Sequence, residues 1–123
     1  MQRKFRLTRS EDFKRVRRSG KSYAHPLVVL IVQTHDKRSN PVGQTRIKVG
    51  VAAGRTVGTA VYRNRAKRLL REAMRALIPD IAPGLDLILI ARPGLVSATL
   101  EDTQRALSNL LQRAQILIPR HES

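Results

Sequence analysis

The sequence predicts an α+β or α/β fold in which helices pack on a single sheet, and three observations carry that prediction. The run LVVLIVQ (27–33) is almost uniformly apolar and rich in β-branched residues, and LDLILIA (85–91) is a second apolar run of strand length. A third segment, RIKVGVAA (46–53), alternates apolar and polar residues as a half-buried strand does. Stretches with helical periodicity precede, separate and follow these strands. The predicted order is therefore helix, strands, helix, strand, helix within one domain that spans residues 1–123.

The first helix is expected over about residues 9–19. Thr8 followed three residues later by Glu11 is the pattern of a capping box, and Gly20 is a natural C-terminal stop. Phe13 and Val16 fall on one side of this helix.

The two strands before the long helix differ in how many of their faces they bury. The run 27–33 predicts a strand that is covered on both faces. The polar segment THDKRSNPVGQT (34–45) contains Asn-Pro and Gly and predicts a hairpin loop. In the strand 46–53, one face is core and the opposite face is small and basic, which leaves room for something to lie on it. The core face consists of Ile47, Val49 and Val51.

The long helix is expected over about residues 60–78. It follows the turn GRTVGT (54–59), where Thr59 is a plausible N-cap, and Pro79 ends it. A final helix, about 100–117, begins at a second capping box, formed by Thr99 and Asp102. The apolar stripe of that helix consists of Thr103, Leu107, Leu110, Leu111 and Ala114.

The charge of the chain indicates a polyanionic partner. Lys and Arg number 24 against 9 Asp and Glu, which gives a formal net charge of +15 and a pI near 11.7. On a foldable domain such an excess usually marks nucleic-acid binding, and an anionic membrane surface is the competing partner. The apolar runs are too short to span a bilayer, and no signal peptide is evident. The absence of cysteine excludes disulfides, cysteine nucleophiles and thiolate zinc sites, and suits a cytoplasmic protein.

The cations concentrate on the long helix, in the stretch VGTAVYRNRAKRLLREAMR (57–75). Its predicted apolar stripe consists of Tyr62, Ala66, Leu69, Leu70, Ala73 and Leu77, whereas the opposite face carries Asn64, Lys67, Arg68, Arg71 and Arg75. Arg63 and Arg65 flank the stripe, and Glu72 is the one acid, able to pair with Arg68 or Arg75. Ordinary solvated faces interleave Glu with Lys, so this face is interpreted as a polyanion-binding surface. With aromatics at 3% of the chain, an RRM or OB-type stacking surface is disfavoured.

The stretch V-G-T-A-V-Y-R-N-R-A-K-R-L-L-R-E resembles the RNR signature of the bacterial ribonuclease P protein subunit. Supporting pieces are F-x-x-V-x-x-x-G (13–20), K-V-G-V (48–51) and L-I-L-I-A-R-P (87–93). The resemblance implies an α-β-β-β-α-β-α fold with a single sheet packed with helices, ribosomal-protein-S5-domain-2-like, with a left-handed crossover. The third strand would lie near residues 22–24.

The resemblance also implies a function in precursor-tRNA maturation. In this family a large RNA subunit uses Mg²⁺ to hydrolyse the phosphodiester at the 5′ end of the mature tRNA. The protein binds that RNA and holds the 5′ leader in a cleft between the first helix and the sheet. The residues that match the RNR motif are Arg63, Asn64, Arg65, Lys67, Arg68 and Arg71, and the candidates for the leader cleft are Phe13, Arg17, Lys48 and Arg55. One turn after Phe13 the family often carries a second aromatic, where this chain has Arg17.

Other function classes have weaker support in the sequence. A stand-alone nuclease needs clustered carboxylates or placed histidines. Here Asp86 is isolated in a strand, and the histidines (His25, His35 and His121) look like scattered surface residues. The chain alone is therefore expected to be non-catalytic, with no metal site of its own and no obligate protein partner. A ribosomal or RNA-chaperone-like structural protein is the main rival, and a DNA-binding regulator ranks lower.

Overall fold

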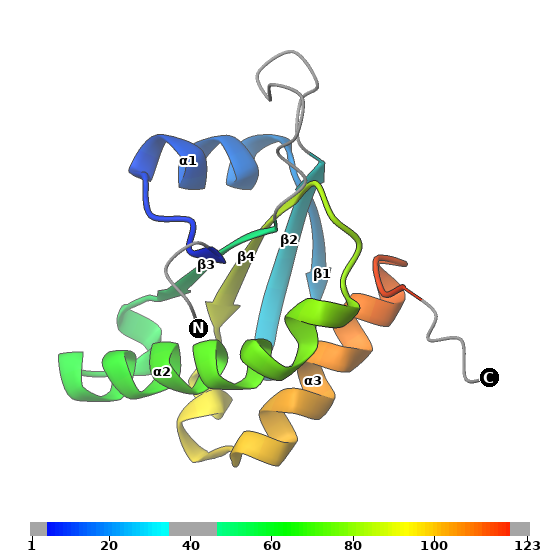
Figure 1. The fold of residues 1–123 in the computed structure, drawn as a ribbon. Helices are drawn as coiled ribbons and strands as arrows, with labels where there is room; N and C mark the ends of the chain where they lie inside the picture. The colour runs from blue at the N-terminus through cyan, green and yellow to red at the C-terminus, as the bar shows by residue number, and fades with distance from the viewer. Residues whose placement is uncertain (1–4, 35–46, 119–123) are drawn as a thin grey trace.

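Three helices and a four-stranded sheet make up the computed structural model, which describes residues 5–34 and 47–118 (Figure 1). The elements agree with an α-β-β-β-α-β-α order, including the short third strand expected near residues 22–24. Three short 3₁₀ turns, at 55–57, 78–80 and 93–97, connect them. In chain order the helices and strands are α1 (Ser10–Ser19), β1 (Lys21–Ala24), β2 (Val28–Thr34), β3 (Lys48–Ala53), α2 (Ala60–Leu77), β4 (Leu85–Ala91) and α3 (Leu100–Arg113).

Strand β4 lies inside the sheet, whose order is β1-β2-β4-β3. It pairs antiparallel with β2 and parallel with β3. Its residues 85–89 are all buried, as expected of a strand with neighbours on both edges and packing on both faces. The hairpin predicted between β2 and β3 is therefore wrong, because β4 separates these two strands. The loop proposed for it, apart from Thr34, lies outside the described residues.

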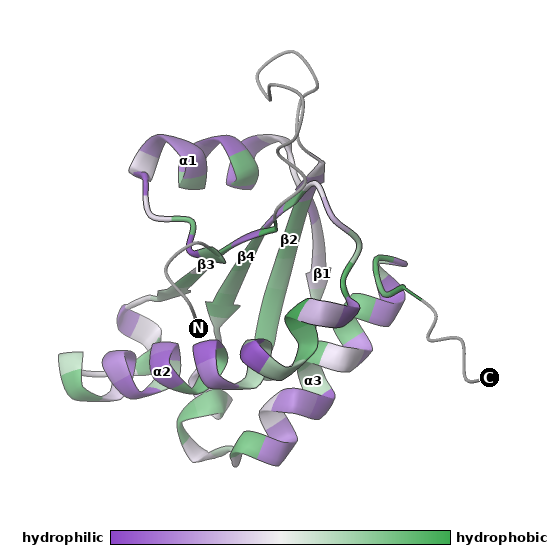
Figure 2. Cartoon of the chain, in the orientation of Figure 1, coloured by the Kyte–Doolittle hydropathy of each residue, from purple (hydrophilic) through white to green (hydrophobic). Residues whose placement is uncertain are grey.

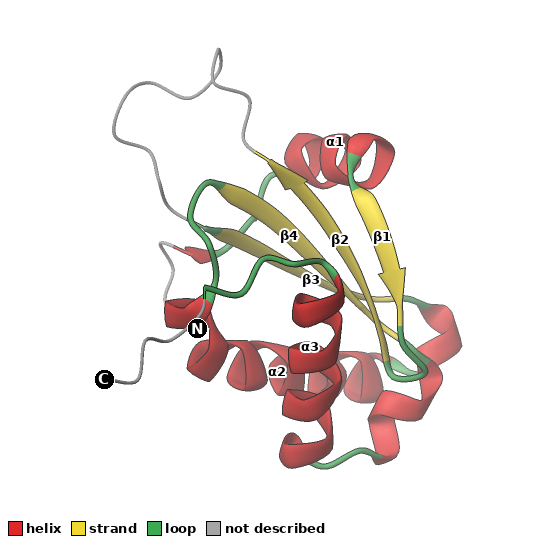
Figure 3. Ribbon diagram, turned by 90° about the vertical axis from the view of Figure 1, so that its right-hand side faces the viewer, coloured by secondary structure: helices red, strands yellow, loops and turns green. Residues whose placement is uncertain are grey.

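Helices cover both faces of the sheet (Figures 1 and 3). Alternate residues of each strand point to opposite faces. Thus Ile31 and Ile88 pack with Val16 under α1, whereas Leu30 and Leu87 belong to the larger core that α2 and α3 cover. Figure 2 shows β2 and β4 as hydrophobic over most of their length, in agreement with a strand 27–33 that is covered on both faces.

Glycine at position 50 explains what occupies the small face of β3. A Cβ atom there would lie 2.4 Å from Cζ of Phe13, so the aromatic ring of α1 rests directly on the β3 backbone. Phe13 thus fills the room that the sequence left open on this face. Gly20, which follows α1, is equally enclosed, since a Cβ there would lie 2.5 Å from the carbonyl oxygen of Val16.

Two helix ends differ from the prediction. α1 begins at Ser10 with Arg9 as N-cap and no side-chain cap, so the capping box expected at Thr8 and Glu11 is absent. The segment before it is held in the sheet instead, where the N–H of Leu7 donates to the carbonyl of Val49 (2.8 Å).

α3 ends at Arg113, four residues before the predicted end. Gln115 adopts a left-handed conformation (φ 59°) and redirects the chain. The following residues then pair with the segment after α2, where Ala82 N–H donates to the Ile116 carbonyl (2.7 Å). The capping box at Thr99 and Asp102 is confirmed. None of the described helices has the length and apolarity needed to cross a membrane.

Candidate nucleic-acid interface

Helix α2 is anchored by one apolar face and presents the other to solvent. Ala66, Leu70 and Ala73 of the predicted stripe are fully buried, and Leu69 and Leu77 are half-buried. Met74, which the predicted stripe omits, is also fully buried. Tyr62 is the exception, because 47% of it is exposed. The core therefore begins about one turn later along the helix than the sequence predicts.

The polar side chains of the motif form two rows along α2. Arg63, Lys67 and Arg71 recur every four residues and are half-buried beside the apolar face. Asn64, Arg65 and Arg68 are exposed. The motif thus presents charge over a wide arc of the helix, from the edge of the core outward.

Among the described residues, carboxylates do not neutralise this arc. Glu72 pairs with Arg75, at 4.0 Å between the charged atoms, and both side chains are well exposed. Within residues 5–34 and 47–118, no carboxylate forms a salt bridge with a cation of the motif. The Nε of Arg63 is buried without a hydrogen-bond partner in the same residues. Cations left in this state are available to an anionic partner.

The charge continues from α2 around the edge of the sheet. Burial, and next the positive charge of Arg6, lower the pKa of Arg71 below its usual value. Arg6 forms an isolated parallel β-bridge with Val49, so it lies along the outer edge of β3. Two guanidinium groups from distant parts of the chain are thereby brought together, an arrangement that an anion between or beside them would stabilise.

The four leader-cleft candidates do not form one cluster. Phe13, half-buried on α1, and Lys48, half-buried at the start of β3, belong to the sheet face that α1 covers, whereas Arg17 is exposed on α1. Arg55 is exposed in the 3₁₀ turn before α2. The α1 face and the motif of α2 therefore lie on opposite sides of the sheet, with the β3 edge between them (Figure 3).

An ion pair between half-buried Arg15 and buried Asp86 joins α1 to the sheet, and the sequence analysis missed it. Asp86 is 3% exposed, and its Oδ2 lies 2.6 Å from Nη2 of Arg15. Nη1 of Arg15 also donates to the side chain of Gln33, and its Nη2 to Asp12 (3.4 Å). The hydrogen bond that Arg15 donates to Asp86 is the main cause that raises the pKa of Arg15. Asp86 is thus not isolated, and an acid within an otherwise apolar strand was the available signal for a charged partner.

Among the described residues, no group of histidine and acidic side chains could hold a metal ion. His25, taken from the sequence as a surface residue, is half-buried, and its Nδ1 accepts the N–H of Leu27 (3.1 Å) in the turn before β2. His35 and His121 lie outside the described residues.

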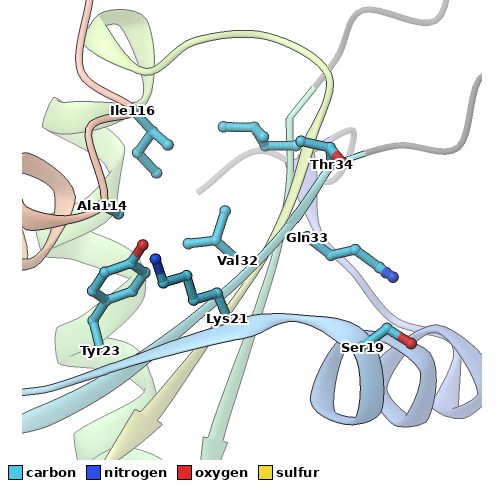
Figure 4. A pocket seen from close by; sticks show the side chains of 9 residues that line it. Ser19, Lys21, Tyr23, Val32, Gln33, Thr34, Ala114 and Ile116 are labelled. Atoms are coloured by element: carbon cyan, nitrogen blue, oxygen red, sulfur yellow. The ribbon is translucent and has the colours of Figure 1, made fainter.

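A pocket of about 510 Å³ lies at the β1 edge of the sheet (Figure 4). Figure 4 shows Lys21, Tyr23 and Val32 directed toward Ala114 and Ile116. The ammonium group of Lys21 lies 5.6 Å from the centroid of the Tyr23 ring. None of the predicted RNA-binding residues lines this pocket.

Comparisons with known proteins give one answer. A family model described as Ribonuclease P matches residues 1–115. The chain is 44% identical to the ribonuclease P protein component of Herpetosiphon aurantiacus over 116 residues, covering 94% of this chain and 89% of that protein. It is 38% identical to that of Brevibacillus brevis over 117 residues, covering 95% and 88%.

Solved structures agree. The structure of the Staphylococcus aureus RNase P protein has a TM-score of 0.76 and 26% identity, covering 92% of this chain and 97% of that chain. The RNase P protein from Thermotoga maritima has a TM-score of 0.73 and 28% identity, covering 88% and 96%. These matches span the sheet, α1 and the basic helix together. The chain belongs to the ribonuclease P protein family, whose members are the protein component of the enzyme that processes the 5′ end of tRNA.

Proposed function

We propose that this chain binds the catalytic RNA of ribonuclease P through α2 and holds the 5′ leader of precursor tRNA on the α1 side of the sheet. The observation that carries the proposal is the set of motif cations on α2, which have no carboxylate partner among the described residues although the helix beneath them is firmly packed. Lys and Arg that neutralise phosphates gain affinity through counterion release, and Arg can contact phosphate oxygens in a bidentate manner.

The exposed and the half-buried polar rows of α2 can contact phosphates at different distances from the protein core. The exposed side chains of Arg65 and Arg68 can reach phosphates of a bound helix or loop. The row of Arg63, Lys67 and Arg71 is half-buried and suits phosphates that lie close to the β3 edge. Asn64 adds a hydrogen-bonding amide between them.

On the other side of the sheet, Phe13 and Lys48 would contact the leader, with Arg17 and Arg55 as outlying cations. Arg17 follows Phe13 by four residues and therefore lies next to it on the helix surface. A cation at this place offers phosphate contact in a cleft whose one aromatic, Phe13, is half-buried against Gly50.

The chemistry is assigned to the RNA, with Mg²⁺ bound through it, so that the chain alone is non-catalytic. Several acids that the structure describes support this assignment, because they already have partners. Asp86 pairs with Arg15, and Asp102 caps α3. We expect the complex to work in the cytoplasm, with no protein partner required.

Reconstitution with a ribonuclease P RNA at low Mg²⁺ tests this function. We expect the chain to stimulate cleavage of precursor tRNA at the mature 5′ end, and Arg68→Gln to reduce that stimulation. Arg105→Gln is the matched control, because Arg105 is an exposed arginine of α3 that pairs with Glu101 (3.0 Å). Tight RNA binding without stimulated processing would favour a purely structural RNA-binding role, and cleavage by the RNA-free chain would overturn the non-catalytic assignment.

Substrates with and without a leader separate the two RNA contacts. Arg17→Ala should weaken binding of leader-bearing precursor more than that of mature tRNA. Arg18→Ala, at another exposed position of the same helix, removes the same charge where helical phase turns the side chain away from Phe13. Equal losses for both substrates would refute the leader contact at Arg17.

A further inference from the structure

The apolar pattern of α2 predicts a buried position for Tyr62, and the structure contradicts this prediction. Helical spacing places it on the core stripe, yet 47% of it is exposed, and its neighbour Val61 is 75% exposed. Large apolar surface on a strongly charged helix carries a solvation cost when no partner covers it. This end of α2 therefore combines aromatic surface with cations.

The Tyr62 side chain lies close to a glycine. Gly58 has a φ of +130°, a conformation that L side chains rarely adopt, and it ends the 3₁₀ turn before α2. A Cβ atom at Gly58 would lie 3.1 Å from Cδ2 and 3.3 Å from Cβ of Tyr62. Glycine at position 58 thus permits the turn and leaves room for the Tyr62 ring beside it. A ring already fixed on one side loses little conformational entropy when a second surface covers it.

The residues around the Tyr62 ring indicate which kind of partner would cover it. Arg65 follows Tyr62 by three residues, so its guanidinium group extends from the same part of the helix surface, and it is exposed. Arg63 is adjacent in sequence, and neither arginine forms a salt bridge among the described residues. A π-face with flanking cations matches a nucleotide, whose base stacks while its phosphates neutralise the charge. An apolar protein surface would bury these cations unpaired, at a high cost.

We propose that Tyr62 stacks on an unpaired base of the RNA that α2 binds. This inference rests on the proposed function, and it adds a salt-independent contact to the phosphate contacts of the motif. Stacking of one base on an aromatic side chain changes affinity by about 5- to 150-fold. The effect should depend on the ring and not on the hydroxyl group.

Affinity for ribonuclease P RNA as a function of salt provides the first test. Tyr62→Leu should weaken binding about 5- to 150-fold while the slope of log K against log salt is unchanged. Tyr62→Phe should retain the affinity. Arg68→Gln should instead make the slope shallower by about 1. Thermal unfolding of Tyr62→Leu without RNA shows whether the variant folds, so that a loss of affinity is not mistaken for a loss of structure.

Fluorescence locates the contact at the ring itself. The chain has two tyrosines and no tryptophan, so Tyr23→Phe leaves Tyr62 as the sole tyrosine emitter. Tyr23 lies on β1 away from α2, and its replacement should not affect RNA binding. RNA should quench the emission of Tyr23→Phe strongly and that of Tyr62→Phe little.

The outcomes separate the two proposals. If the unaltered chain binds RNA but Tyr62→Leu binds equally well, or if Tyr62 emission is unchanged on binding, the stacking is refuted and the proposed function stands. If the unaltered chain does not bind ribonuclease P RNA, both are overturned.

Discussion

Replacement of Gly50 by alanine tests whether the Phe13 ring sets the position of α1 on the sheet. The added Cβ would lie 2.4, 2.8 and 3.0 Å from three atoms of the Phe13 ring. Non-bonded carbon atoms prefer separations of about 3.5–4.0 Å. The ring must therefore move by roughly 1 Å, and α1 must tilt or Phe13 must leave its rotamer.

The size of the effect follows from two opposing terms. Overpacking of this kind costs about 1–3 kcal/mol. Alanine in a strand offsets about 0.5–1 kcal/mol of this, because glycine loses more backbone entropy on folding. We expect Gly50→Ala to lower the free energy of unfolding by about 1–2 kcal/mol. For a chain of this length that corresponds to a fall in Tm of roughly 4–8 °C.

A double-mutant cycle measured by urea denaturation isolates the contact. Phe13→Leu removes the ring atoms that the new Cβ would meet, so Gly50→Ala should cost less in that background by about 1 kcal/mol or more. Identical costs of Gly50→Ala with Phe13 and with Leu at position 13 would refute the reasoning. Gly54→Ala is the control, because a Cβ there meets nothing within 4 Å.

The remaining predictions concern other contacts of the helices. Arg15→Met should lower the free energy of unfolding by about 2–3 kcal/mol, because it leaves the buried Asp86 carboxylate without this partner. The loss should be smaller when Asp86→Asn is also present. Equal losses in the two backgrounds would contradict a coupled pair. Thr99→Ala should cost about 1 kcal/mol through loss of the N-cap. The hydrogen bond from the Thr99 N–H is the main cause that lowers the pKa of Asp102; a lowered pKa in the folded state gives stability above the unfolded pKa of about 3.9, which is lost as pH falls through the folded value. Asp102→Asn should remove that part of the pH dependence, and acid titrations of Tm for both proteins check it. Lys67→Gln should raise the free energy of unfolding by a few tenths of a kcal/mol through reduced repulsion, yet weaken RNA binding, and unchanged RNA affinity would argue against a phosphate contact.

Local signals predicted the elements well. The run 85–91 became β4 with the same bounds, because a short apolar run after Pro-Gly has few other ways to bury itself. The long helix was expected over about 60–78 and spans Ala60–Leu77. Both features depend on periodicity and on turn residues within a few positions, which a single sequence contains in full.

Contacts between distant segments were beyond such signals. The insertion of β4 between β2 and β3 replaced the expected hairpin, since pairing depends on which strand is buried on both faces and not on sequence proximity. The pair between Arg15 and Asp86 joins residues 71 positions apart. The exposure of Tyr62 depends on where the sheet ends beneath α2. Such features arise only when the elements are packed together.

The energetics of α2 explain how a small protein can retain so much like charge on one helix. Leu70 and Met74 are fully buried, and each such side chain contributes about 1.5–3 kcal/mol relative to an exposed one. Like charges four residues apart cost a few tenths of a kcal/mol per pair, and the half-buried row of Arg63, Lys67 and Arg71 contains two such pairs. Burial therefore outweighs repulsion several-fold, and the helix can fold even though no carboxylate of the described residues pairs with the motif. Additional acids would gain little stability and, in the function proposed above, would compete with RNA phosphates for the cations.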